Sequence, residues 1–106
     1  MHTELISEVL DESGLGIKIR VDGSLPRVEL RRIGEEWAAS RSHRASRVWV
    51  WLYGHQMDED GPAMLVTYLE PGRNPVSDFI PASTLLMYYL GEGGLGAVPR
   101  MRPTLA

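Results

Sequence analysis

A run of six apolar residues at positions 48–53 constrains the fold more than any other part of this chain. It reads Val-Trp-Val-Trp-Leu-Tyr, and β-branched and aromatic residues favour strands. Because side chains alternate along a strand, one face is aliphatic and the other is wholly aromatic. The aromatic face consists of Trp49, Trp51 and Tyr53. Either both faces are buried in a central strand, which we favour for so small a chain, or the aromatic face is partly open and binds something.

The size and composition indicate a single domain with a real hydrophobic core. The chain has 106 residues, of which 43% are hydrophobic, and it has no cysteine. The absence of cysteine excludes disulfides, thiolate nucleophiles and cysteine-based metal sites. No apolar run approaches the roughly 20 residues that span a bilayer. We therefore expect a cytoplasmic protein without membrane association, with one domain over residues 1–90 and a Gly/Pro-rich tail over residues 91–106.

The first 34 residues predict a helix followed by a hairpin. Residues 3–13 carry an apolar stripe at helical spacing, with Thr3 placed to cap the helix and Gly14 placed to end it. The stripe consists of Leu5, Ile6, Val9 and Leu10. Apolar residues alternate over residues 17–21 and again over residues 27–33, with an Asp-Gly turn signal between them. Residues 35–46 fit a short helix, a twisted strand or an exposed loop, and the pattern does not decide among these.

The second half predicts the centre of the sheet and a last helix. Residues 63–69 form another apolar strand, which we expect to pair with residues 47–54 as a long antiparallel hairpin. Prolines and glycines over residues 70–81 indicate a loop, and residues 82–90 indicate a helix. The predicted fold class is α+β, with an antiparallel sheet of about four strands and an N-terminal and a C-terminal helix packed on it.

Motifs that carry chemistry are weak in this chain. Residues 91–96 match G-x-G-x-x-G, but no strand precedes them and no αβ unit follows, as a dinucleotide site requires. Residues 58–61 resemble the opening of a calcium loop, but Leu69 stands where the closing carboxylate belongs. The three histidines have no metal-binding spacing. We therefore expect no catalytic residues, no cofactor and no metal, and interpret the protein as a non-enzyme.

A basic block directly before the aromatic strand is the main candidate binding feature. Residues 27–47 contain six arginines against three glutamates, whereas the whole chain has a net charge of −3. Arginines beside aromatic residues are typical of sheets that bind single-stranded nucleic acid, and also of protein–protein hot spots. The acidic net charge favours the protein partner. The predicted partner-binding residues are Arg41, Arg44, Arg47, Trp49, Trp51 and Tyr53.

A family resemblance rests on strand spacing and on the tryptophans. The quoted segments are Ile33-Gly34-Glu35-Glu36-Trp37, Val48-Trp49-Val50-Trp51 and Val66-Thr67-Tyr68-Leu69-Glu70-Pro71-Gly72. Over residues 28–90 they resemble small SH3-like barrel proteins of phages and mobile elements. The resemblance implies a strongly bent sheet and a binding or inhibitor module without a cofactor, and it transfers no site residues.

These observations predict a small bacterial or phage protein-binding module. We expect it to act as an adaptor or steric inhibitor of a protein partner. The alternative is a nucleic-acid-binding module that uses the arginine and aromatic surface, and a homodimer through a strand edge or the aromatic face is also open. If the aromatic face is exposed, replacing Trp51 with alanine, or Arg44 with glutamate, weakens partner binding while the fold survives.

Overall fold

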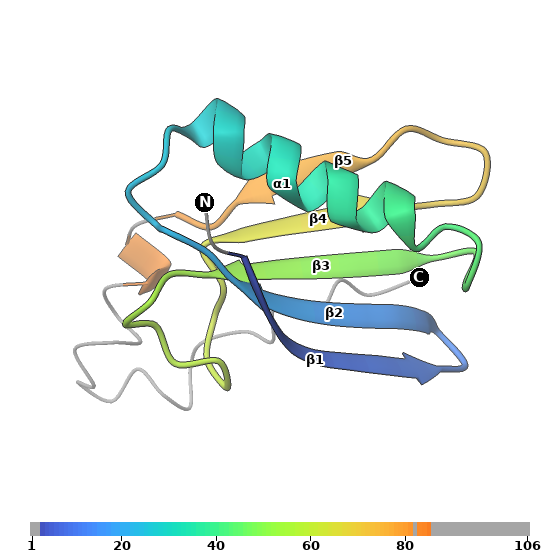
Figure 1. The fold of residues 1–106 in the computed structure, drawn as a ribbon, viewed down its shortest axis with the longest axis horizontal. Helices are drawn as coiled ribbons and strands as arrows, with labels where there is room; N and C mark the ends of the chain where they lie inside the picture. The colour runs from blue at the N-terminus through green and yellow to red at the C-terminus, as the bar shows by residue number, and fades with distance from the viewer. Residues whose placement is uncertain (1–2, 82, 86–106) are drawn as a thin grey trace.

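The computed structural model describes residues 3–81 and 83–85, and shows a small α+β domain in which one helix lies on a five-stranded sheet (Figure 1). The elements in chain order are β1 (Glu4–Asp11), β2 (Gly14–Arg20), α1 (Arg27–Ser40), β3 (Val48–Tyr53), β4 (Leu65–Leu69) and β5 (Val76–Phe79). The strands lie in the sheet in the same order as in the chain. β2 and β3 are parallel, with α1 as their crossover connection, and the other neighbours are antiparallel.

The central hairpin is confirmed, but the predicted sheet is wrong in size and type. β3 and β4 pair antiparallel, with Val48 opposite Leu69 and Leu52 opposite Leu65. The sheet is mixed and has five strands, rather than about four antiparallel strands. The helix on the sheet is neither N-terminal nor C-terminal, because it lies between β2 and β3.

The predicted N-terminal helix at residues 3–13 is wrong, because this segment forms strand β1. Its apolar residues come as two adjacent pairs, and this spacing also fits a strand that is exposed on both faces. A bulge between Leu5 and Ser7 shifts the register in mid-strand. The turn into β2 is held by Asp11, whose Oδ1 accepts hydrogen bonds from the Ser13 amide at 2.8 Å and the Ser13 hydroxyl at 2.6 Å. Gly14 then has a φ of 138°, which favours glycine.

The predicted strand at residues 27–33 is also wrong, because these residues begin helix α1. The residues that α1 buries recur at helical spacing and are Leu30, Ile33, Gly34 and Ala38. Two of the four are small, so a count of large apolar side chains misses half of the stripe. For residues 35–40 the helix was one of three open alternatives, and it is the correct one.

The C-terminal part contains a strand that was predicted to be loop. Within residues 70–81, Val76–Phe79 form β5 and pair with β4. Pro75 and Pro81 flank this short strand, and their presence led to the loop prediction. Residues 83–85 are helical. Position 82, the rest of the predicted helix at residues 86–90, and the predicted tail at residues 91–106 lie outside the described residues.

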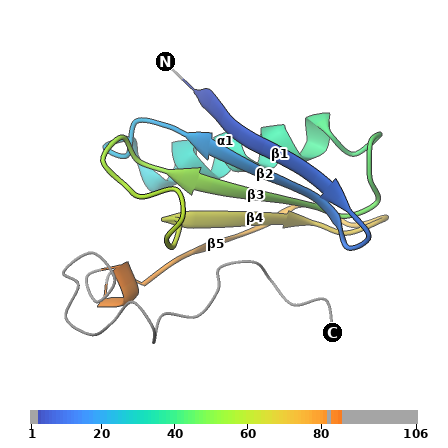
Figure 2. The ribbon, with the colours of Figure 1, turned by 90° about the horizontal axis from the view of Figure 1, so that it is seen from below.

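The two faces of the sheet are covered differently (Figure 2). On the helix side, aliphatic residues of β2, β3 and β4 pack against α1 and form the larger core cluster. On the opposite side, aromatic residues of β3 form a second cluster with Ala63 and Val66. The favoured interpretation of the aromatic strand is confirmed, since Trp49 is 0% exposed, Trp51 7% and Tyr53 2%.

The loop after β3 is tied to the aromatic side of the sheet. Nη1 of Arg20 donates hydrogen bonds to the carbonyl oxygens of Gly54 at 2.7 Å and Met57 at 3.0 Å. Nη2 of the same guanidinium pairs with Glu59 at 2.9 Å. Met57 packs against the aromatic cluster. The loop therefore helps to bury the three aromatic side chains that the sequence left open to either interpretation.

Candidate functional site

The six predicted partner-binding residues do not form one surface. Three of them, the aromatic residues of β3, are buried. Arg47 lies near Tyr68, which belongs to the aromatic side. Burial raises the pKa of Tyr68, and a hydrogen bond that its hydroxyl donates to Glu70 raises it further, while nearby Arg47 acts in the opposite direction. Arg41 and Arg44 lie instead beside β1. The binding role of these six residues therefore stays a prediction.

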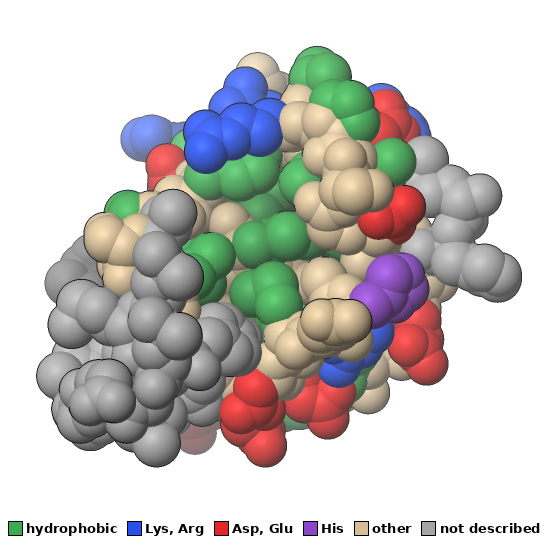
Figure 3. Space-filling model, turned by 90° about the vertical axis from the view of Figure 1, so that its left-hand side faces the viewer, with side chains coloured by type: hydrophobic (Ala, Val, Ile, Leu, Met, Phe, Trp, Pro, Cys, Tyr) green, Lys and Arg blue, Asp and Glu red, His purple; other side chains and the backbone are tan. Residues whose placement is uncertain are grey.

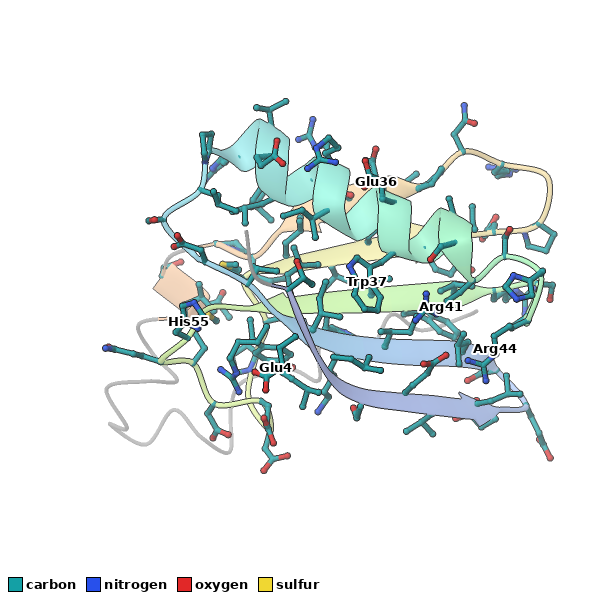
Figure 4. All side chains as sticks on the ribbon, in the orientation of Figure 1. Glu4, Glu36, Trp37, Arg41, Arg44 and His55 are labelled. Carbon is teal, nitrogen blue, oxygen red and sulfur yellow. The ribbon has the colours of Figure 1, made fainter. Side chains whose placement is uncertain are left out.

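Arg41 and Arg44 lie near each other (Figure 4), and both pair with one carboxylate of β1. Nε of Arg41 lies 3.6 Å from Oε2 of Glu8, and Arg44 donates a hydrogen bond to the same oxygen. The Arg41 guanidinium also lies 4.8 Å from the centroid of the Trp37 ring. The side chain of Glu8 is only 17% exposed. Two positive charges therefore compensate the one negative charge at this position.

Helix α1 leaves the β1 side of the sheet uncovered (Figure 1). Its backbone lies close to β3, β4 and β5, and not to β1 or β2. Leu5, Glu8 and Leu10 face the helix side, because they lie opposite Ile19, Ile17 and Leu15 of the helix-side core. Leu5 is 44% exposed and Leu10 56%. These side chains lie beside the helix rather than beneath it.

The outer side of β1 is one edge of the sheet, as the structure describes it. β1 is the first strand of the sheet, and within residues 3–81 and 83–85 no strand pairs with its outer side. Along an edge strand, alternate residues direct their N–H and C=O groups away from the sheet. The bulge between Leu5 and Ser7 leaves a regular stretch over residues 7–11. We call the outer side of this stretch, with its exposed residues Val9 and Leu10, the open edge.

The opposite edge of the sheet carries the usual features that prevent edge pairing. β5 has only four residues, lies between Pro75 and Pro81, and bears the charged Asp78. In the described part of the chain five large hydrophobic residues are exposed, and three of them lie on β1. These three are Leu5, Val9 and Leu10. Among the described residues, the longer and more apolar edge of the sheet is therefore on β1.

Two other surfaces carry fewer features that indicate a functional site. Figure 3 shows hydrophobic side chains at the end of the molecule where α1 begins. At this end the guanidinium groups of Arg27 and Arg31 lie 4.6 Å and 5.9 Å from the Phe79 ring centroid. A cavity of about 400 Å³ near the C-terminal end of α1 is lined by small residues and loop residues, together with the ion pair of Glu70 and Arg73. In the described part of the chain, neither place gathers groups for catalysis.

The described residues contain no cluster of three histidine, aspartate or glutamate side chains that could hold a metal ion. Among the helices in this part of the chain, none has the length and hydropathy needed to cross a membrane. No family model, no curated protein and no solved structure matches the chain. The SH3-like resemblance therefore stays a prediction, and function has to be argued from the geometry of the fold.

Sequence reasoning found part of this site and missed the rest. It selected Arg41 and Arg44, but it placed Val9 and Leu10 in the buried stripe of a helix. The available signal was the mixture of acidic residues with adjacent apolar pairs over residues 4–11, which suits an edge strand as well as a helix. Exposure of Val9 and Leu10 follows from the place of β1 in the sheet, which the strand order decides.

Proposed function

We propose that this chain is a non-enzymatic protein-binding module that takes up an extended segment of its partner as an additional strand on the open edge. By occupying that segment it acts as an adaptor or a steric inhibitor. The observation that supports the proposal is the difference between the two edges of the sheet. β5 is short and flanked by prolines, whereas β1 offers regular backbone with exposed Val9 and Leu10.

Strand addition explains why apolar residues lie on both faces of β1. An added strand gains main-chain hydrogen bonds, each with a net value of about 0.5–1.5 kcal/mol. Its side chains alternate between the two faces of the sheet. On the helix side, the side chains of the added strand lie beside Leu10, near Trp37 and Arg41. On the aromatic side, they lie beside Val9. Affinity then comes from the backbone, and selectivity comes from both rows of side chains.

The two arginines have a defined role in this proposal. They compensate Glu8, the one carboxylate that faces the helix side in the middle of the open edge. Arg44 keeps 43% of its side chain exposed, so it is available to a residue of the incoming strand. No observation favours the nucleic-acid alternative, because the three aromatic residues that would stack on bases are buried.

A pair of matched substitutions tests the proposal. Val9 on β1 is 58% exposed and Val76 on β5 is 57% exposed, so the change to lysine is equivalent at the two edges. We expect Val9→Lys to weaken partner binding about ten-fold or more, since it replaces an apolar contact by a charge. We expect Val76→Lys to bind like the wild type. The measurement is quantitative recovery of partners from a lysate of the source organism, with nuclease present.

The comparison of variants decides the result. Circular dichroism and thermal unfolding first establish that both variants fold. A partner that the wild type and Val76→Lys recover, and Val9→Lys does not, supports the open edge. Equal recovery by both variants contradicts it, and recovery that disappears with nuclease shows nucleic-acid binding instead.

A further inference from the structure

The open edge lies between exposed carboxylates. Residues 4–12 contain four acidic residues and no lysine or arginine. Glu8 is compensated by the two arginines described above. Glu4 lies beyond one end of the open edge, and Asp11 and Glu12 lie at the other, and all three are exposed. The cross-strand neighbour of Glu4 is Arg20, whose guanidinium is paired with Glu59.

This charge distribution disfavours a second copy of the same chain as the occupant. A second copy that paired its own β1 here would bring the same acidic residues to the same edge. Like charges on adjacent strands destabilise the pairing. The carboxylates therefore protect an apolar, unpaired edge from self-association, in the way that charged side chains protect edge strands in other proteins.

We infer that the partner segment is an extended, basic strand, in which apolar residues alternate with lysine or arginine. This inference rests on the proposed function, because it specifies the chemistry of the strand that the open edge takes up. The apolar residues contact Val9 on one face and Leu10 on the other. The basic residues lie toward the ends, near Glu4 on one side and near Glu12 on the other. The same carboxylates thus repel a second copy and attract this partner.

The test begins with a random peptide library displayed on phage. The purified full chain selects binders, and parallel selections with Val9→Lys remove those that bind elsewhere. We expect the selected peptides to carry net positive charge, with apolar residues at alternate positions. We also expect their affinity to fall with added salt, since exposed charges are screened. Selected peptides that are acidic or neutral, with affinities independent of salt, overturn the inference.

Charge removal at the two ends of the edge provides a second measurement. In the double variant Glu4→Gln with Glu12→Gln, we expect the selected peptides to bind about four- to sixteen-fold more weakly, at about two- to four-fold for each exposed charge. We also expect more self-association in analytical ultracentrifugation. The matched control is Glu36→Gln with Asp60→Asn, which removes two exposed carboxylates that lie on neither edge of the sheet and should change neither property.

The outcomes separate this inference from the proposed function. If Val9→Lys abolishes peptide binding while the glutamine variant and its control bind equally well, the open edge is a docking site but the basic partner is wrong. If the parallel selection with Val9→Lys removes every peptide that the wild type binds, the open edge itself is wrong. A wild-type protein that dimerises through β1 contradicts the role of the carboxylates.

Discussion

Replacing Gly34 with alanine is expected to lower the free energy of unfolding by about 2 kcal/mol, although alanine is the better helix former. A Cβ at this position would overlap the hydroxyl oxygen of Thr67 and would lie 3.3 Å from Cδ1 of Leu52. Thr67 is completely buried, and its hydroxyl is hydrogen-bonded to Ser77 at 2.8 Å. Ser77 in turn donates to Glu35 of α1 at 3.1 Å. Turning the threonine away from an added methyl would therefore break this chain of buried hydrogen bonds.

Two opposing effects decide the sign of this prediction. Alanine in place of glycine within a helix gains about 1 kcal/mol. Overpacking of a core position costs about 1–3 kcal/mol, and more where a neighbour cannot move. Urea unfolding measures the balance. The control is Thr67→Ala, because in that background the added methyl meets less obstruction and Gly34→Ala should cost at least about 1 kcal/mol less. Stabilisation by Gly34→Ala in the wild type would show that α1 does not pack closely on β4.

Replacing Trp51 with alanine is expected to lower the free energy of unfolding by about 3–5 kcal/mol, the usual cost for a large buried aromatic residue. Trp51 is 7% exposed and packs in the aromatic cluster with Val66. Small domains have a total stability of about 5–15 kcal/mol, so much of it would be lost. Survival of the fold was expected for an exposed aromatic face, and the burial of Trp51 changes that expectation.

Chemical unfolding, followed by circular dichroism, checks the prediction. The matched control is Trp37→Ala on α1, since Trp37 is only half-buried and its removal should cost clearly less. Arg44→Glu should also remain folded, because Arg44 is 43% exposed. An unfolding midpoint of Trp51→Ala equal to that of the wild type would mean that the aromatic side of β3 is open.

The sequence predicts the centre of this fold well and its periphery poorly. β3 and β4 are recognisable because each is almost entirely apolar, so local composition and burial agree. The sequence pattern does not reveal helix α1, because Gly34 and Ala38, where the helix approaches the sheet most closely, have little or no side chain. The pattern also does not reveal β5, because prolines flank this strand. β1 depends on pairing with β2, and such non-local contacts override a helical pattern.

The candidate site was also predicted only in part from the sequence. Arg41 and Arg44 stand out in the sequence by charge, but their common partner Glu8 lies more than 30 residues earlier, on another element. Val9 and Leu10 gain their significance from exposure, which only the strand order and the position of α1 determine. The aromatic residues that looked most suited to binding instead stabilise the core.

Amide hydrogen exchange tests the open edge most directly. Exchange is measured for each residue, in the free protein and in the complex with a selected peptide. Strand addition predicts that alternate amides within residues 7–11 become protected, while the amides that already pair with β2 change little. Residues of β5 should exchange as in the free protein. Protection confined to α1 or to the loop after β3, with the amides of β1 unchanged, would contradict the account.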